Sequence, residues 1–331
     1  MGLHKTVAKL AVPGKGILAA DESSPTIKKR FDSVGIESNP KTRHDYRHTI
    51  FSTECLEEHI SGVILFDETL RSQDTIEPLK QKGICLGIKV DKGAKPYDNS
   101  GGKLTEGLDG LTERLREYKD LGAEFAKWRA VITVNDSDAC ILANTWTLAR
   151  YAKKCQDQGL VPIVEPEVIM DGNHSIDQSQ ATTSKALHHL FDALYYEGVE
   201  LESIVLKPNM ILQGYDNKKG WKQPLDAMKY IDYDYTVSDY TTGCFKRDVP
   251  AAVPMIAFLS GGQPDGEATK NLNGINRHSN LPWYVSFSFG RELQQNAIKE
   301  WANGEPEEAK ATLLNAAARC GKATGRRGMI I

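Results

Sequence analysis

Ionisable side chains stand at the ends of short apolar segments in this chain, where a buried strand would deliver them to the edge of a sheet. Lys207 follows the apolar run 204–206, and Pro208 comes directly after it. Because proline lacks the N–H that a central strand must donate, we expect strand pairing to stop there. The amine of Lys207 would then lie at the mouth of a core element, partly out of water.

A half-buried lysine of this kind can react with carbonyl compounds. Burial and a neighbouring cation both favour the neutral amine, and a neutral lysine amine forms Schiff bases. The alternative is an ordinary solvated lysine at the end of a strand. The two interpretations differ in what should lie nearby, because Schiff-base chemistry also needs a second cation and a group that carries protons.

Charged residues recur within other apolar runs. Lys127 and Arg129 stand two residues apart in EFAKWR, and Glu165 and Glu167 do the same in IVEPE. Side chains alternate along a strand, so the two members of each pair point to one face. Because unpaired charges are costly to bury, a structural salt bridge is one interpretation of any single pair.

Further charges at other strand ends favour an active site over a structural role. Asp21 ends the first apolar run, Lys89 lies in the third, and Arg291 follows the last. Ionisable groups from so many segments would converge on one place only if that place performs chemistry. We therefore predict a site with an acid–base set and a pair of lysines.

The elements that must position these groups are eight apolar runs, with amphipathic helical patterns between most of them. The runs cover residues 14–21, 59–69, 84–93, 124–134, 160–170, 201–210, 253–262 and 283–290. Strands that alternate with helices form parallel βα units, and eight such units close a (β/α)8 TIM barrel. A doubly wound open sheet is the alternative. In a barrel, the charged strand ends would meet at one mouth.

Glycine-rich turns after the last two runs predict a phosphate site. Ser260-Gly261-Gly262 follows the seventh run, and Gly290-Arg291 follows the eighth. Loops after strands seven and eight of these barrels commonly bind phosphate through backbone N–H groups. Glycine lets the backbone approach an anion, and an arginine can bind it through two N–H groups.

Composition and charge restrict the class of protein. The 331 residues are 26% charged and 40% hydrophobic, and the net charge of −3 gives no basis for binding nucleic acid or an anionic membrane. Six cysteines without CxxC spacing indicate buried free thiols in a reducing compartment. The chain has neither a signal-peptide pattern nor an apolar run of about 18 residues, so we expect a cytoplasmic protein.

Motifs for metals and nucleotide cofactors are incomplete. The glycine pattern at 14–19 precedes a predicted strand instead of following one, unlike a dinucleotide-binding fingerprint. His44 and His48 lack the glutamate of the zinc-protease motif, and the adjacent His188 and His189 diverge on a helix. We therefore expect no metal site and no cofactor.

No linker or low-complexity segment divides the chain, so we predict a single domain over residues 1–331. A long tyrosine-rich segment at about 213–247 lies between the sixth and seventh predicted strands. It is far longer than an ordinary βα connection. A contact with another subunit and a lid over the site are the two interpretations.

The motifs in these segments resemble those of the class I, Schiff-base-forming fructose-1,6-bisphosphate aldolases. The resemblance covers about residues 13–322 in the order of the family and rests on KGILAADES, GVILFDETL, GIKVDKG, EFAKWR, GLVPIVEPE, LKPNM, FLSGGQ and FSFGRELQ. It implies a metal-independent (β/α)8 lyase, usually a homotetramer. The family cleaves fructose 1,6-bisphosphate reversibly to dihydroxyacetone phosphate and glyceraldehyde 3-phosphate, in glycolysis and gluconeogenesis.

The resemblance also implies roles for single residues. Lys207 in LKPNM matches the Schiff-base lysine, whose iminium accepts electrons when the carbon–carbon bond breaks. Glu165 matches the proton shuttle that dehydrates the carbinolamine, and Glu167 lies beside it. Lys127 would favour the neutral amine of Lys207 and hold the substrate.

The remaining matches complete the predicted site. Arg129 would organise the two glutamates, and Asp21 in AADES matches the base that takes the C4 hydroxyl proton. The matches to the phosphate sites are Ser260, Gly261, Gly290 and Arg291 for one phosphate and Ser23, Arg30 and Lys89 for the other. Carboxylates near two lysines can divide into acid and base, and two bound phosphates would orient the bond to be broken.

One departure from the family concerns the step after bond cleavage. Members commonly end in a tyrosine implicated in proton exchange on the enamine, whereas the last tyrosine here is Tyr284, in a predicted strand. Water or another group would perform this step, or the step is slow; the tyrosines that could substitute are Tyr230, Tyr233, Tyr235 and Tyr240. Two alternative functions are an aldolase for a different ketose phosphate and a scaffold protein with a secondary role.

Overall fold

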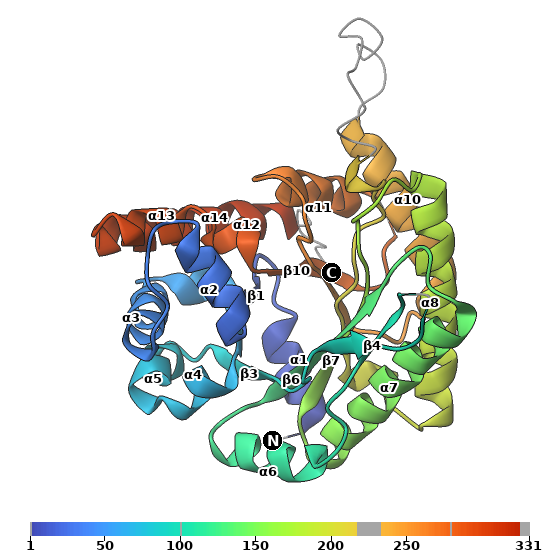
Figure 1. Ribbon diagram of the computed structural model, residues 1–331, viewed down its shortest axis with the longest axis horizontal. Helices are drawn as coiled ribbons and strands as arrows, with labels where there is room; N and C mark the ends of the chain where they lie inside the picture. The colour runs from blue at the N-terminus through green and yellow to red at the C-terminus, as the bar shows by residue number, and fades with distance from the viewer. Residues whose placement is uncertain (1, 100, 217–232, 279, 325–331) are drawn as a thin grey trace, which may run out of the picture.

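Eight parallel strands close into a barrel in the computed structural model, which describes residues 2–99, 101–216, 233–278 and 280–324 (Figure 1). The barrel strands are β1 (Gly16–Ala20), β2 (Ile60–Leu65), β3 (Cys85–Lys89), β6 (Phe125–Ile132), β7 (Val161–Val168), β8 (Val205–Leu206), β9 (Met255–Phe258) and β10 (Tyr284–Phe289). Their order around the barrel is β1-β10-β9-β8-β7-β6-β3-β2. Each predicted run contains one of these strands. The predicted (β/α)8 barrel is therefore confirmed, and the open-sheet alternative is wrong.

Helices surround the barrel, with α2 to α5 on one side and α7 and α8 on the other (Figure 1). The helices before β7 are α1 (Leu3–Leu10), α2 (Ser24–Asp32), α3 (Pro40–Phe51), α4 (Asp67–Arg71), α5 (Gln73–Gln81), α6 (Leu111–Asp120) and α7 (Asp138–Asp157). The later helices are α8 (Ile176–Tyr196), α10 (Tyr233–Asp248), α11 (Glu267–Arg277), α12 (Arg291–Gln294), α13 (Ala297–Ala302) and α14 (Pro306–Thr324). Two short 3-10 turns span Leu56–Glu58 and Leu201–Ser203. The C-terminal part of the chain therefore forms three separate helices, α12, α13 and α14.

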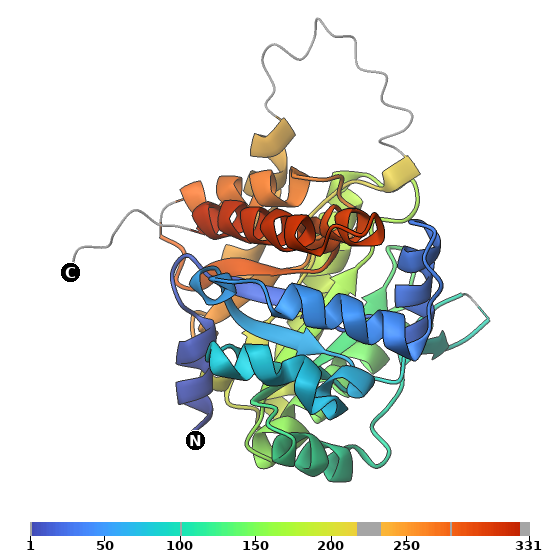
Figure 2. The same ribbon diagram turned by 90° about the vertical axis from the view of Figure 1, so that its left-hand side faces the viewer.

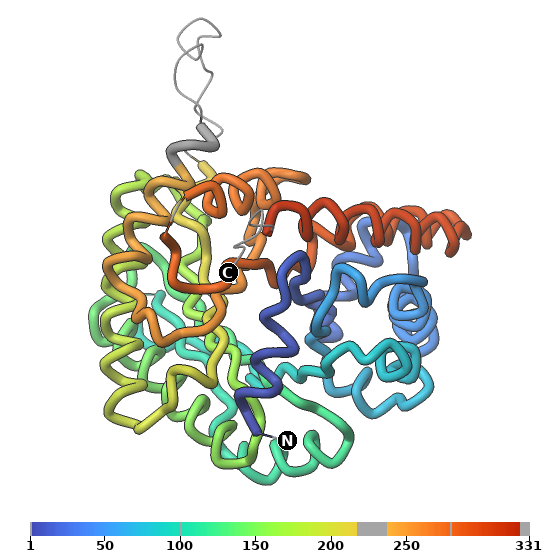
Figure 3. Tube along the Cα trace, turned by 180° about the vertical axis from the view of Figure 1, so that it is seen from behind, coloured from blue at the N-terminus to red at the C-terminus, as the bar shows by residue number. Residues whose placement is uncertain are grey.

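The last helix closes the ring between the final and first repeats. Helix α14 packs against both α3 and α11, so residues from the two ends of the chain lie side by side (Figure 2). The leading helix α1 was not predicted, and it lies across the N-terminal end of the barrel (Figure 3). The antiparallel pair β4 (Ala94–Pro96) and β5 (Lys103–Thr105) was also missed.

The N-terminal half of the barrel lumen is a packed apolar core. Val7 and Leu10 of α1 join the inward-facing residues Phe125 and Ile163 in one buried cluster. The Phe125 ring occupies the space beside Gly87 so fully that a Cβ at Gly87 would lie 2.0 Å from it. This packing leaves only the C-terminal half of the lumen for charged side chains.

The alternation of side chains along the strands explains this division. In β6, Phe125 faces the apolar lumen cluster, whereas Trp128 packs with the outer helices. Lys127 and Arg129 share the parity of Phe125, and Glu165 and Glu167 share that of Ile163 in β7. Both charged pairs therefore point into the lumen, as predicted.

The cysteines and the apolar helices test two predictions made from the composition. All six cysteines are free, as expected, but Cys55 is exposed, which corrects the expectation that all of them are buried. Cys55 lies in a tight connection before the turn Leu56–Glu58, with a left-handed φ of 57°. Within the described ranges, no helix is both long enough and apolar enough to cross a membrane.

Candidate active site

Four charged side chains form a continuous chain of ion pairs at the C-terminal end of the lumen. Lys127 Nζ lies 2.7 Å from Asp21 Oδ2 and 3.2 Å from Glu165 Oε2. Lys207 Nζ lies 3.2 Å from Glu165 Oε1. The side chains of Lys127, Glu165 and Lys207 are each 4% exposed. Two lysines therefore share one carboxylate in a place that is almost closed to water.

Strand register sets this arrangement. The pairing of Val164 with Leu206 places Glu165 and Lys207 at the same height on neighbouring strands. The N–H of Lys207 still donates to Val164 O at 2.8 Å, and β8 ends there because Pro208 has no N–H to continue the ladder. The predicted delivery of the Lys207 amine at the end of a buried strand is confirmed.

Electrostatic interactions keep both members of the ion pair between Lys127 and Asp21 charged. Burial disfavours the charged form of Lys127, but the Asp21 and Glu165 carboxylates outweigh this effect and raise its pKa. Burial also disfavours ionised Asp21, yet Lys127 and Lys207 hold its pKa below the ordinary value. Lys127 is therefore a fixed cation and Asp21 a fixed carboxylate at neutral pH.

A second set of charges lies on the neighbouring strands. Arg129 Nε donates to Glu167 Oε2, and Lys89 Nζ lies 2.6 Å from Asp91 Oδ1. The backbone N–H of Arg129 approaches Asp91 Oδ2 at 3.4 Å, which connects the two pairs. Burial opposes the charge of Arg129, but Glu167 outweighs it and raises the pKa. Arg129 thus orients Glu167, whereas Glu165 is oriented by the two lysines.

The predicted phosphate residues of the last two strands meet after β9 and β10. Ser260 is buried two residues after the end of β9, and Gly261 has a left-handed φ of 52° that glycine adopts easily. Arg291 Nη2 donates to Gly261 O across the two loops. Gly290 packs so closely that an added Cβ would lie 3.2 Å from Ala19 O.

The other predicted phosphate residues do not form one cluster. Arg30 Nη2 lies 3.6 Å from the Cβ position of Gly290, so it stands beside the Arg291 loop. Lys89, at the end of β3, instead forms an ion pair with Asp91. Strand β3 lies on the other side of β1 from β10. Ser23 Oγ is 3.1 Å from Thr26 Oγ1 at the start of α2. Burial and the nearby Arg30 guanidinium both lower the pKa of Arg291, which marks a place where an anion would be stabilised.

Three polar residues of this region were missed in the sequence. Ser288 lies in β10 with the lumen parity, its hydroxyl is buried, and no described residue hydrogen-bonds to it. Asp91 orients Lys89, and Glu22 forms an ion pair with Arg30. Alternating polar residues in YVSFSFG and the carboxylate next to Asp21 were the available signals. A buried hydroxyl without a partner is suited to bind a sugar hydroxyl or phosphate.

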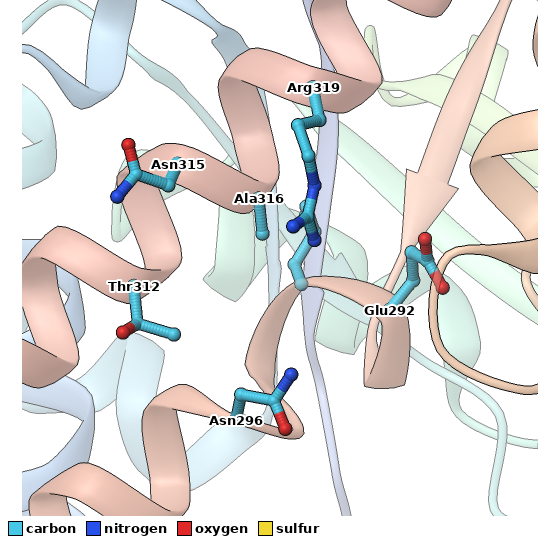
Figure 4. A pocket seen from close by; sticks show the side chains of 7 residues that line it. Glu292, Asn296, Thr312, Asn315, Ala316 and Arg319 are labelled. Atoms are coloured by element: carbon cyan, nitrogen blue, oxygen red, sulfur yellow. The ribbon is translucent and has the colours of Figure 1, made fainter.

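Glu292 connects helix α12 to the segment after β9 through hydrogen bonds. The Glu292 carboxylate accepts from Gly266 N–H at 3.1 Å and from the Thr269 hydroxyl, which joins α12 to the segment after β9. A cavity of about 190 Å3 opens behind α12 (Figure 4). Its lining residues are Glu292, Leu293, Asn296, Thr312, Asn315, Ala316 and Arg319. None of the predicted site residues lines this cavity.

The described residues offer no cluster of metal ligands, and the side chains of Tyr240 and Tyr284 have other hydrogen-bond partners. In the part of the chain that the structure describes, no group of three or more His, Cys, Asp or Glu side chains could hold a metal ion. Tyr240 donates to Asp177 at 2.7 Å on the surface, and Tyr284 donates to Lys15 O at 2.8 Å. Tyr230, the side chains of Tyr233 and Tyr235, residues 217–232 of the elaborated segment and residues 325–331 lie outside the described part.

Known proteins resemble this chain over nearly its whole length. The family described as class-I fructose-bisphosphate aldolase matches residues 2–327. The chain belongs to this family. Such an aldolase is a lyase of glycolysis that cleaves fructose 1,6-bisphosphate reversibly to dihydroxyacetone phosphate and glyceraldehyde 3-phosphate through a lysine Schiff base. The predicted activity is therefore confirmed.

Similar aldolases occur in distant organisms. A probable class 1 fructose-bisphosphate aldolase of Xylella fastidiosa is 48% identical, with 91% of this chain and 89% of that protein covered. Cytosolic fructose-bisphosphate aldolase 5 of Arabidopsis thaliana is 44% identical, with 98% and 92% covered. A solved structure of the Plasmodium falciparum aldolase superposes with a TM-score of 0.90 at 42% identity, covering 97% and 93% of the two chains.

Proposed function

We propose that Lys207 is the Schiff-base lysine of this aldolase. The supporting observation is that its buried amine and that of Lys127 contact the two oxygens of one carboxylate, Glu165. Glu165 can take a proton from Lys207, and the neutral amine then attacks C2 of the ketose. As the new C–N bond forms, the carbonyl π bond breaks, and a proton passes from the nitrogen to the former carbonyl oxygen to give the hydroxyl of the carbinolamine.

Glu165 returns the proton in the next step. Protonation of the carbinolamine hydroxyl lets it leave as water, and the nitrogen lone pair forms the iminium. Lys127 stays charged 3.2 Å from Glu165 and holds this carboxylate in place. Arg129 holds Glu167 next to Glu165. Glu167 there orients the sugar and Glu165, which carries the proton.

Asp21 is the base for bond cleavage. It accepts the C4 hydroxyl proton, the C3–C4 bond breaks, and the electron pair moves into the iminium to give an enamine. Asp21 is a weak base while Lys127 Nζ lies 2.7 Å away, because this cation lowers its pKa. When Lys127 turns to a substrate hydroxyl, Asp21 loses part of this stabilisation and becomes a stronger base.

Two phosphate sites hold the ends of the substrate. Ser260, Gly261, Gly290 and Arg291 bind one phosphate, with Arg30 beside them. Ser23 and Lys89, which the family resemblance groups with Arg30, bind the other. The neighbouring guanidinium groups of Arg30 and Arg291 support an anion between the two loops, because it would offset their repulsion. Binding of both ends orients the bond that breaks.

The remaining proposals concern organisation. We propose one domain, a cytoplasmic location in line with the cytosolic Arabidopsis thaliana relative, and a homotetramer as the resemblance implies. An exposed aromatic cluster supports a contact with another copy: Tyr195 and Tyr196 are 79% and 73% exposed, and Trp146 stacks on Tyr196 with ring centroids 6.0 Å apart. Light scattering after chromatography, with Tyr196→Glu as the variant, tests this assembly.

Borohydride trapping tests the assignment of the lysine. Reduction in the presence of dihydroxyacetone phosphate should add one triose phosphate to the peptide that contains Lys207, as seen by mass spectrometry. The matched variant Lys207→Met should show no adduct, and a chelator should leave cleavage unchanged. An adduct on Lys127 in place of Lys207 would contradict the proposed roles of the two lysines.

A further inference from the structure

Glu22 carries a buried carboxylate that none of the proposed steps uses. It directly follows Asp21 at the end of β1, and its side chain is 5% exposed. One of its oxygens, Oε1, accepts from Arg30 Nη1 and also, at 3.2 Å, from Gln294 Nε2. A single carboxylate oxygen therefore connects α2, which carries Arg30, with α12, which begins at Arg291.

The surroundings hold this carboxylate in one position. Arg47 is 2% exposed and donates from Nη2 to Glu22 O at 2.8 Å. Gln294 donates to Ala19 O at 2.8 Å, and its own carbonyl accepts from the Tyr46 hydroxyl at 3.2 Å. Both the backbone of Glu22 and its partner on α12 are thus fixed by buried hydrogen bonds, which resist reorientation.

Glu22 thereby sets the direction of the Arg30 guanidinium. The Nη1 group of Arg30 is committed to Glu22, while Nη2 lies 3.6 Å from the Cβ position of Gly290. Guanidinium is planar, so fixing one N–H edge also fixes where the other edge points. The free edge faces the loop of Gly290 and Arg291, where a phosphate is proposed to bind.

The same carboxylate also offsets a repulsion. Arg30 lies close enough to Arg291 that its guanidinium disfavours the charge of Arg291. A flexible arginine without a partner would turn toward water and away from the second cation. Because Glu22 is nearly unexposed, water screens its attraction for Arg30 only weakly.

We infer that Glu22 is a positioning residue for phosphate binding, which holds Arg30 beside Gly290 and Arg291 and links it to α12 through Gln294. This inference rests on the proposed placement of a substrate phosphate at Arg30. It assigns to Glu22 an effect on substrate binding, because Glu22 acts through Arg30 and contacts no reacting atom in the proposed mechanism. Affinity for the bisphosphate should therefore change far more than the rate of the chemical steps.

The experiment measures kcat and KM for fructose 1,6-bisphosphate in four variants of the full chain and in one control variant. Glu22→Ala should raise KM about ten-fold with kcat changed less than about three-fold, since a hydrogen bond between charged groups is lost. Glu22→Gln should raise KM less, because its amide oxygen can still accept from Arg30 and Gln294. Arg30→Ala should raise KM, and Arg30→Ala with Glu22→Ala should raise it no further. The matched control is Asp32→Ala, which removes an exposed ion pair with Lys28 on the same helix.

The KM values distinguish failure of the positioning role of Glu22 from failure of the proposed phosphate placement. An unchanged or lowered KM in Glu22→Ala, with Arg30→Ala still impaired, overturns the positioning role alone. A further rise in KM when Glu22→Ala is added to Arg30→Ala also overturns it, because Glu22 would then act by another route. If Arg30→Ala itself leaves KM unchanged, the proposed phosphate placement fails. If Glu22→Ala does not fold, the same criteria apply to Glu22→Gln.

Discussion

Replacement of Lys127 by methionine tests the ion-pair chain of the site. The substitution keeps the length of the side chain and removes its ammonium group. Glu165 retains its 3.2 Å contact with Lys207, whereas Asp21 loses its 2.7 Å partner and remains only 13% exposed. Removal of one member of a buried ion pair typically costs about 3–5 kcal/mol. Because Glu165 keeps a cation, we expect the lower end, about 3 kcal/mol at neutral pH.

This free energy converts to a melting temperature. The entropy of unfolding is about 2 cal/mol/K per residue, which gives roughly 0.7 kcal/mol/K for a chain of 331 residues. A loss of about 3 kcal/mol therefore corresponds to a decrease of about 4 °C in Tm. Such a shift is measurable by differential scanning calorimetry.

The sign of the pH dependence distinguishes this cause from a general packing defect. In the unchanged protein, Asp21 has a lowered pKa, so its pairing stabilises the fold above the ordinary carboxylate range of about pH 4 and is lost as the pH falls further. Without Lys127, burial is opposed only by the weaker attraction of Lys207 and Lys89, so the pKa of Asp21 should rise. The variant should then lose stability as the pH rises from about 5 to about 7.5, because a buried carboxylate that has lost its nearest cation must ionise.

Calorimetry at several pH values provides the measurement. The Tm difference between Lys127→Met and the unchanged protein should grow from about pH 5 to about pH 7.5. Lys127→Arg should lose less, since it keeps the charge. The surface control Lys153→Met breaks an exposed pair with Asp157 and should lower stability by less than about 1 kcal/mol. A Tm within about 1 °C of the unchanged protein at every pH would refute the reasoning.

Three further predictions concern single positions. Glu165→Gln should lower kcat for cleavage by about 10²-fold to 10⁴-fold, because the proton shuttle is lost; steady-state assays of fructose 1,6-bisphosphate cleavage check this. Asp21→Asn should abolish cleavage yet still permit borohydride trapping of dihydroxyacetone phosphate on Lys207, and loss of trapping would contradict its role as the C4 base. Gly87→Ala should lower stability by about 1–3 kcal/mol, because its Cβ would lie 2.0 Å from the Phe125 ring; an unchanged Tm in calorimetry would show that the lumen core can shift.

Much of the fold was predictable because barrel strands are buried on both faces. Each of the eight strands is a short apolar run, and β7 is buried at every position from Val161 to Val168. Helix α1 and the β4–β5 pair were not predicted because they lack such a fully buried apolar run. The first contributes only a few apolar residues such as Val7 and Leu10, and the second is a largely exposed three-residue pair without a buried stripe.

Part of the candidate site was also predictable from strand parity. Charged residues two apart in β6 and β7 had to share a face, and an apolar core at Phe125 and Ile163 required that the charges lie above it. The position of Arg30 beside Gly290 and Arg291 was less predictable from the sequence. Its place beside Gly290 depends on how α2 packs relative to the loop after β10, and no local pattern specifies that contact.

The sequence by itself determined the family, the barrel and the positions that carry charge, since each is encoded by local motifs and by alternation along single strands. Only the tertiary structure decided which charges pair. Lys127 contacts both Asp21 and Glu165, Lys89 pairs with Asp91, and Arg30 pairs with Glu22. The physical reason is that ion pairing depends on distances of about 3–4 Å between segments far apart in the chain, which strand register and helix packing set.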